Sequence, residues 1–170
     1  MTKMQQNKNN IVIDALGTQH NRTSFKCGIS SLDDYIKKQA KQDVKRRISQ
    51  VFIATEPASS SLITGYYTLS SLSVELNNLP EALACKLPRH PIPAALIGRL
   101  AVSLHAQKNG IGKMLLVDAI KRTLAVSEEI AIYAVVVDAI NEEVQRFYEQ
   151  FGFTPLNTET RRLFLPLKSL

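Results

Sequence analysis

The chain has few of the residues that build disulfide frameworks and metal sites. Its 170 residues include two cysteines, three histidines and no tryptophan. Cys27 and Cys85 show no metal-ligand spacing, and two cysteines are too few for a disulfide framework, so both are expected to be reduced. The histidines are scattered along the chain without ligand spacing, so no metal site is predicted.

Long apolar segments are also missing. The longest uninterrupted apolar run, Ile130–Val137, has eight residues, whereas a membrane-spanning helix needs about 20. Residues 1–10 are polar and rich in Asn and Gln, so no signal peptide is expected. We therefore predict a disordered tail over residues 1–10, a single domain over residues 11–170 and a cytoplasmic location.

Positive charge is in excess, with 21 Lys and Arg against 15 Asp and Glu. A capping box at residues 31–34 predicts a helix with an apolar stripe, and six of the basic residues fall on or just beyond its opposite side. They are Lys37, Lys38, Lys41, Lys45, Arg46 and Arg47, with Asp43 as the only acid among residues 37–47. The pattern fits either a solvated helix face or a surface that contacts nucleic-acid phosphates.

The order of the remaining segments predicts a mixed sheet. We expect strands at residues 11–16, 50–55, 62–74, 94–103, 130–137, 153–156 and 162–168, and helices at 81–87, at 113–126 and after residue 141. Four prolines exclude a strand from residues 77–93. Strand 94–103, helix 113–126 and strand 130–137 form a βαβ unit, which makes those two strands parallel. The fold class is therefore α+β (mixed α/β), with a central, mostly antiparallel sheet of six to seven strands flanked by helices.

Two residues inside strand 94–103 stand out. Gly98 predicts a bulge or a close approach of another group to its backbone. Arg99 is the only charged residue of the strand, so it either reaches solvent at an edge or serves a site.

A phosphate-binding turn is predicted between strand 94–103 and helix 113–126. It consists of Gln107, Lys108, Asn109, Gly110, Ile111 and Gly112. A glycine-bearing turn that enters a helix presents backbone N–H groups at the positive end of the helix dipole, where they bind phosphate without any particular side chain.

These segments resemble the GNAT superfamily of acetyl-CoA-dependent N-acetyltransferases. The turn is similar to the superfamily's [Arg/Gln]-x-x-Gly-x-[Gly/Ala] pyrophosphate loop, and Leu100, Ala101 and Val102 match the strand before it. Asn141 and the segment 147–153 match its helix with the "FYxxxGF" ending. The resemblance implies the GNAT fold, with a splayed parallel pair of strands at the acetyl-CoA site, and no metal.

A narrower resemblance covers the front of the chain. The segments 25–28, 32–35 and 40–43 look like the "F-x-C-G … LD-x-Y … A-x-Q-D" opening of GNAT toxins from bacterial toxin–antitoxin systems. This resemblance implies an enzyme that acetylates the α-amino group of aminoacyl-tRNA and so inhibits translation. It also implies a ribbon-helix-helix antitoxin as partner and a homodimer.

The resemblance gives roles to particular residues. The backbone of residues 108–113, including Lys113, would hold the CoA pyrophosphate, the strand edge of residues 100–102 would pair with pantetheine, and Asn141 would be a further CoA contact. Tyr148 would be the general acid that protonates the leaving thiolate. Lys37, Lys38, Lys41, Lys45, Arg46 and Arg99 would contact tRNA phosphates.

No general base is evident, and Glu75 and Glu81 are the nearest candidates in the sequence. At pH 7.5 a sizeable fraction of an α-amine is neutral, against only about 0.1% of a lysine amine. A site without a base therefore favours α-amines. Two alternatives remain open: a GNAT that acetylates a small amine or a protein N-terminus, and a silent CoA-binding or repressor-partner module.

Overall fold

The computed structural model describes residues 10–88 and 91–170. Of the predicted tail, only Asn10 lies within these residues. His90 lies outside them. The chain divides into two compact units, which we call the first unit (up to Tyr67, with Leu100–Leu116) and the second unit (Thr68–Arg99 and Val117–Leu170). The prediction of a single domain over residues 11–170 stays a prediction.

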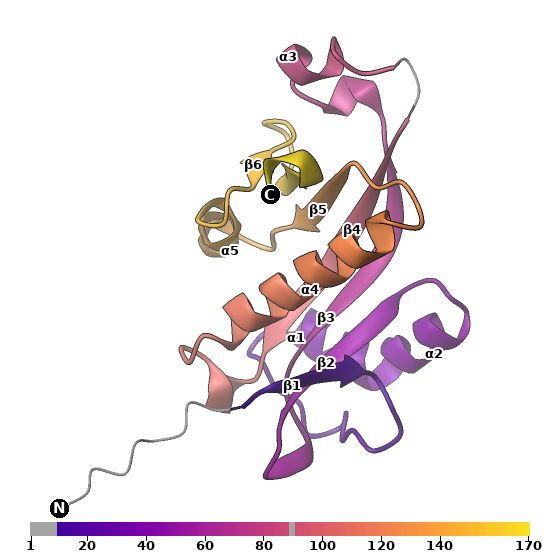
Figure 1. Ribbon diagram of the computed structural model, residues 1–170. Helices are drawn as coiled ribbons and strands as arrows, with labels where there is room; N and C mark the ends of the chain where they lie inside the picture. Colours follow the sequence, from indigo (N-terminus) through magenta and orange to yellow (C-terminus); the bar gives the residue numbers. More distant parts are fainter. Residues whose placement is uncertain (1–9, 89–90) are drawn as a thin grey trace, which may run out of the picture. The chain divides into compact units, whose positions relative to one another are not determined.

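Within the described residues, seven strands form one sheet in the order β1-β2-β3-β4-β5-β7-β6 (Figure 1). The strands are β1 (Val12–Ala15), β2 (Gln50–Glu56), β3 (Ser59–Val74), β4 (Ile92–Val102), β5 (Ala134–Asp138), β6 (Thr154–Pro155) and β7 (Arg162–Pro166). The helices are α1 (Ser30–Asp34), the π-helix η1 (Tyr35–Gln39), α2 (Ala40–Lys45), α3 (Glu81–Ala84), α4 (Ile111–Ser127) and α5 (Glu142–Glu149). Short 3₁₀ turns lie at Leu76–Asn78 (η2), Leu104–Ala106 (η3) and Leu167–Ser169 (η4).

The parallel pair predicted from the βαβ unit is confirmed. Ala94–Ile97 of β4 pair in parallel with Ala134–Val137 of β5, with Ala94 opposite Ala134 and Ile97 opposite Val137. β1 with β2, β5 with β7, and β6 with β7 are antiparallel. The sheet is therefore mixed, and strand β1 lies at one edge.

The core of the first unit is built around Tyr66 of β3, which has no exposed surface. Its ring lies 5.4 Å from that of Phe25 in an edge-to-face arrangement and 6.2 Å from that of Tyr35. Its hydroxyl donates to the carbonyl of Leu32 at 2.6 Å. These contacts hold one side of the α1–η1–α2 segment against the core, which leaves its other side for the lysines.

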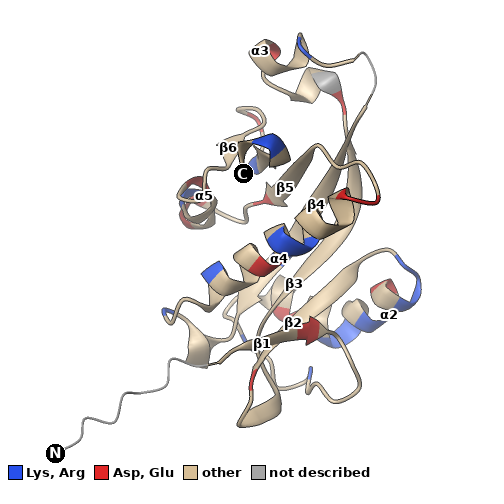
Figure 2. Ribbon diagram, viewed as in Figure 1, with Lys and Arg blue, Asp and Glu red and all other residues tan. Residues whose placement is uncertain are grey.

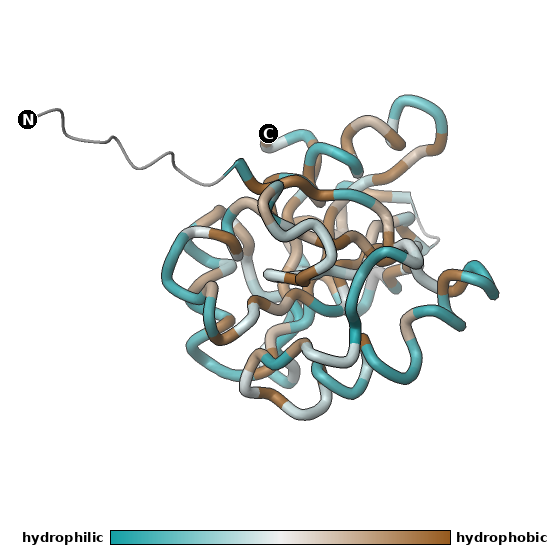
Figure 3. The backbone as a smooth tube through the Cα atoms, turned by 90° about the horizontal axis from the view of Figure 1, so that it is seen from below, coloured by the Kyte–Doolittle hydropathy of each residue, from teal (hydrophilic) through white to brown (hydrophobic). Residues whose placement is uncertain are grey.

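The core of the second unit packs around β4, β5 and β7. Buried residues of these strands, among them Ala94, Val136 and Phe164, meet Val74 and Leu156 in one cluster. The continuous β-branched run of β5 is fully buried, and such runs are typical of strands covered on both faces. In Figure 3 most of the peripheral turns of the chain are hydrophilic, as burial of apolar surface requires.

The helix start at residues 31–34 is not the predicted capping box. The N-cap is Ile29, whose side chain makes no capping bond. Asp33 instead accepts the backbone N–H of Cys27 at 2.8 Å. The carboxylate therefore joins the helix to the turn before it.

Several predicted strand boundaries are wrong, since β3 begins at Ser59 rather than 62 and β7 ends at Pro166 rather than 168. Ile92 and Pro93 belong to β4, although the prolines were expected to keep strands out of residues 77–93. Pro93 is tolerated because its carbonyl, rather than the N–H that proline lacks, makes the bond, accepting the N–H of Tyr133 at 2.9 Å. β5 begins only at Ala134, and Ile130 is 67% exposed.

Candidate active site

The predicted phosphate turn connects β4 to α4 in the first unit. Lys108 has φ 67° and Gly110 has φ 80°, the left-handed conformation that reverses the chain before the helix. A Cβ atom at Gly110 would have no atom within 4 Å, so space is open above this backbone. The first helical bond joins the N–H of Met114 to the carbonyl of Gly110 at 3.1 Å. The N–H groups of residues 111–113 therefore have no acceptor within the helix and are available to an anion.

The turn is tied to two other segments through Gln107. Its side-chain amide donates to the carbonyl of Cys27 at 2.9 Å and to that of Val102 at 3.0 Å. The N–H of Leu104 also donates to the carbonyl of Lys26 at 2.8 Å. The segment 25–28 at the front of the chain thus supports the turn. Sequence reasoning missed this contact, because nothing in the sequence links positions 80 residues apart.

Gly65 of β3 allows close packing below the turn. A Cβ atom there would lie 2.9 Å from the carbonyl oxygen of Ala101 and 2.9 Å from the side chain of Leu115. Only glycine fits this approach without displacement. The strand residues 100–102 and the first turns of α4 are therefore seated against β3.

Tyr148 lies on α5 in the second unit and is 2% exposed. Its ring packs against Phe147 at 5.4 Å and Phe153 at 5.6 Å between centroids. Burial raises the pKa of its hydroxyl well above the usual value, and the charge of Asp138 adds to this effect. The phenol therefore carries its proton at neutral pH, which is the state that a general acid requires.

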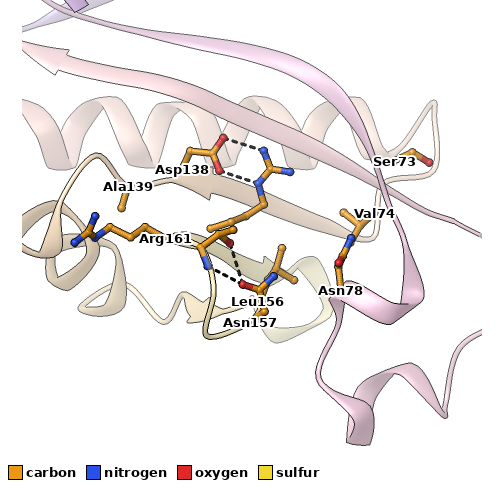
Figure 4. A pocket seen from close by; sticks show the side chains of 10 residues that line it. Ser73, Val74, Asn78, Asp138, Ala139, Leu156, Asn157 and Arg161 are labelled. Atoms are coloured by element: carbon orange, nitrogen blue, oxygen red, sulfur yellow. Dashed lines mark hydrogen bonds and ion pairs between the residues drawn. The ribbon is translucent and has the colours of Figure 1, made fainter. Parts of the chain in front are cut away.

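Asp138 at the end of β5 was not singled out from the sequence. Its carboxylate accepts two hydrogen bonds from Arg162 of β7, at 2.7 and 2.9 Å. The pair lines a pocket of about 310 Å³ whose other walls include Ser73, Asn78 and Asn157 (Figure 4). Hydrophobic patterning carries no signal for such a pair, because each partner is a charged residue at a strand end.

Asn141 is the N-cap of α5, as its position predicted. Its side-chain oxygen accepts the N–H of Val144 at 2.9 Å. The amide oxygen is thereby engaged in the helix, and its role as a CoA contact stays a prediction. Glu75 and Glu81, the two candidate bases, are both exposed.

The basic residues 37–47 lie in the first unit and colour α2 and the turn after it in Figure 2. Lys38, Lys41, Lys45, Arg46 and Arg47 are exposed, and Lys37 is half-buried. Asp43 is buried and accepts the hydroxyl of Tyr35 at 2.9 Å. The only acid of the segment is therefore withdrawn from the surface, which leaves the exposed side positive.

Arg99 belongs to the second unit and is half-buried. Its backbone N–H donates to the hydroxyl of Thr68 at 3.0 Å. A Cβ atom at Gly98 would lie 3.4 Å from the same hydroxyl, which is about the limit of ordinary van der Waals contact. The tRNA contact proposed for Arg99 stays a prediction.

Among the described residues, no cluster of His, Cys, Asp and Glu could hold a metal ion. No helix in residues 10–88 and 91–170 is long and apolar enough to cross a membrane. Both cysteines are free, Cys27 buried and Cys85 exposed.

A strand that ends in a turn with free N–H groups at a helix N-terminus, with a parallel strand beside it, is typical of proteins that bind a phosphate-bearing cofactor. The family model for the acetyltransferase (GNAT) domain matches residues 49–155. The chain belongs to the GNAT acetyltransferase family.

Two curated relatives match most of the chain. The probable toxin TacT of Sinorhizobium fredii is 31% identical over 89% of this chain and 88% of its own length. A tRNA-acetylating toxin of Mycobacterium tuberculosis is 34% identical, with 86% of each chain covered.

Solved structures match nearly the whole chain. The structure of AtaT complexed with acetyl-methionyl-tRNAfMet has a TM-score of 0.86 at 28% identity, and covers 94% of this chain and 96% of that one. A tyrosine-to-phenylalanine mutant of AtaT, bound to the C-terminus of the antitoxin AtaR and to acetyl-CoA, has a TM-score of 0.81 at 26% identity, with 95% and 96% covered.

Proposed function

We propose that this chain is a toxin-type N-acetyltransferase that transfers the acetyl group of acetyl-CoA to the α-amino group of aminoacyl-tRNA and so inhibits translation. The observation that carries the proposal is the pair of hydrogen bonds from Gln107, which joins the GNAT turn to the carbonyl of Cys27. Cys27 lies in the front segment that resembles GNAT toxins. The name of the Mycobacterium tuberculosis relative and the tRNA in the AtaT complex support the same substrate, and the name of the Sinorhizobium fredii relative supports a toxin.

Acetyl-CoA would bind to the first unit. The turn fits a pyrophosphate, because the space above Gly110 is open and the N–H groups of residues 111–113 have no helical acceptor. The edge of Leu100–Val102 would pair with the amides of pantetheine as an added strand does. A backbone N–H of the same edge would stabilise charge on the reacting carbonyl oxygen. Bound acetyl-CoA supplies the activated acetyl thioester.

Tyr148 would deliver the proton that the departing thiolate takes up. Its burial keeps the hydroxyl protonated at neutral pH. AtaT with a tyrosine replaced by phenylalanine still binds acetyl-CoA, and we expect the same of this chain when Tyr148 is replaced. No base is assigned, because an aminoacyl α-amine is partly neutral at pH 7.5 without one.

The exposed basic residues of 37–47 would contact tRNA phosphates. Charge reversal at Lys37, Lys41 and Lys45 should weaken tRNA binding and flatten its salt dependence, while acetyl-CoA affinity stays unchanged. Salt-dependent binding of labelled tRNA measures this, and unchanged affinity of the triple variant would remove the role.

An antitoxin is the proposed protein partner, as in the AtaT–AtaR complex. In line with the resemblance of the front segments, we propose that this antitoxin is of the ribbon-helix-helix type and that the enzyme is a homodimer. A cytoplasmic location fits a substrate that serves the ribosome.

The deciding experiment is acetyl transfer from labelled acetyl-CoA to total charged tRNA, with the modified aminoacyl group identified by mass. Polyamines and peptides are compared in parallel. We expect label on the aminoacyl group. Label on peptides or polyamines alone would support the alternative, a GNAT for small amines or protein N-termini, and no transfer to any amine would indicate a silent CoA-binding module.

A further inference from the structure

A second pocket, of about 340 Å³, lies in the first unit beside α2. Its walls are residues 16–18 after β1, His20, Arg22, and Lys41 and Val44 of α2. It therefore combines two apolar side chains with several hydrogen-bond donors. Neither the GNAT turn nor Tyr148 contributes to it.

His20 provides a donor of fixed orientation. It is only 8% exposed, and its Nδ1 accepts the N–H of Gly17 at 3.0 Å. A neutral imidazole carries one proton, so the proton lies on Nε2, which can donate to a ligand. Burial lowers the pKa of His20, with the charge of Asp14 acting in the opposite direction, and the ring is neutral at physiological pH.

Arg22 joins the pocket loop to the helix behind it. Its guanidinium donates to the carbonyl of Lys37 at 3.1 Å and to that of Ile36 at 3.4 Å, both in the π-helix η1. A π-helical turn displaces carbonyls from the regular ladder, and such turns are frequent at functional sites. The loop, Arg22 and the helix thus form a built pocket rather than a gap between mobile segments.

The positive charge around the pocket favours an anionic ligand. Lys41 lines it, while Lys45, Arg46 and Arg47 follow on the same exposed segment. Asp43, the only acid of that segment, is buried against Tyr35, which leaves Asp14 as the negative group that acts on His20. The balance is positive, and positive donors in a small concave site favour a phosphate.

We propose that this pocket seats one phosphate group of the nucleic-acid partner together with the ribose that carries it. Lys41 binds the phosphate, Thr18 and His20 donate hydrogen bonds, and Leu16 and Val44 pack against the ribose. The neighbouring basic residues then follow the adjoining backbone. This inference rests on the proposed function, since it takes the partner to be tRNA.

The test compares two lysines of the same helix. Lys41 lines the pocket and Lys45, one turn later, does not, although both are exposed. We expect Lys41→Gln to weaken tRNA binding roughly tenfold, because a charge-assisted bond in a pocket is lost. Lys45→Gln should weaken it only about twofold, as one screened surface charge does. Fluorescence anisotropy of labelled tRNA at fixed salt measures both.

Two further variants remove neutral donors. Thr18→Val keeps the shape of an exposed residue, and His20→Asn keeps an acceptor for the N–H of Gly17 while it removes the distal donor. Each should weaken tRNA binding about threefold to tenfold and leave acetyl-CoA affinity unchanged. Circular dichroism and melting temperature confirm that each variant is folded.

The source of the phosphate is assigned with two forms of the tRNA. If the loss caused by Lys41→Gln disappears with tRNA whose 5′-phosphate has been removed, the pocket seats that terminal phosphate; a loss that persists assigns an internal one. Equal losses for Lys41→Gln and Lys45→Gln would overturn the pocket and leave the proposed function intact. Failure of the unmodified chain to bind tRNA would overturn both.

Discussion

Gln107→Leu tests whether the tie between the turn and the front segment prepares the acetyl-CoA site. Leucine has a similar size but cannot donate, so the carbonyls of Cys27 and Val102 lose bonds of 2.9 and 3.0 Å. Each such bond contributes about 0.5–1.5 kcal/mol net. The two bonds together contribute about 1–3 kcal/mol, and this free energy keeps the turn ordered before acetyl-CoA binds.

The loss should therefore appear in binding. We expect the dissociation constant of acetyl-CoA to rise by about 5- to 150-fold, because about 1.4 kcal/mol corresponds to a factor of ten. The turnover number at saturating acetyl-CoA should change much less, since the reacting groups are untouched. Isothermal titration calorimetry gives the affinity, and steady-state kinetics with the amine substrate gives the turnover.

The matched control is Gln42→Leu, the same substitution at an exposed position of α2. It should leave acetyl-CoA affinity within about twofold, because surface changes are usually small. If Gln107→Leu also stays within twofold while the protein remains folded, either the turn is not the cofactor site or these bonds do not order it. Either result would refute the reasoning.

Three further predictions follow from single contacts. Tyr148→Phe keeps the ring contacts with Phe147 and Phe153, so acetyl-CoA affinity should be retained while turnover falls about 10²–10⁴-fold; full turnover would disprove the acid role. Gly65→Ala places a Cβ atom 2.9 Å from the carbonyl oxygen of Ala101, so denaturant unfolding should show a loss of about 1–3 kcal/mol, and an unchanged midpoint would contradict the close packing. The free energy of unfolding should fall as pH rises above about 9. Burial raises the pKa of Cys27 to about 11 and also raises the pKa of Tyr148, so the folded chain keeps protons that the unfolded chain releases. In urea titrations from pH 8 to 11 the Cys27→Ala, Tyr148→Phe double variant should lose this pH dependence, and an equal slope would count against the burial argument.

The sequence by itself determined the order of the elements and the position of the turn before α4. The β-branched run of β5, the turn before α4 and the N-cap Asn141 are local patterns. Each was found because strand, turn and cap preferences depend on neighbouring residues. Boundaries were less secure, as Pro93 shows, because a strand ends where its partner ends and not where the propensity of its residues changes.

The tertiary structure alone decided which distant residues support one another. The side chain of Gln107 binds the carbonyl of Cys27, 80 residues away, and Asp138 binds Arg162, 24 residues away. Hydrogen bonds between polar groups far apart in sequence leave no periodic trace, since any donor and acceptor of suitable type could pair. Folding selects the pairs because a polar group buried without a partner costs more than one exposed to water.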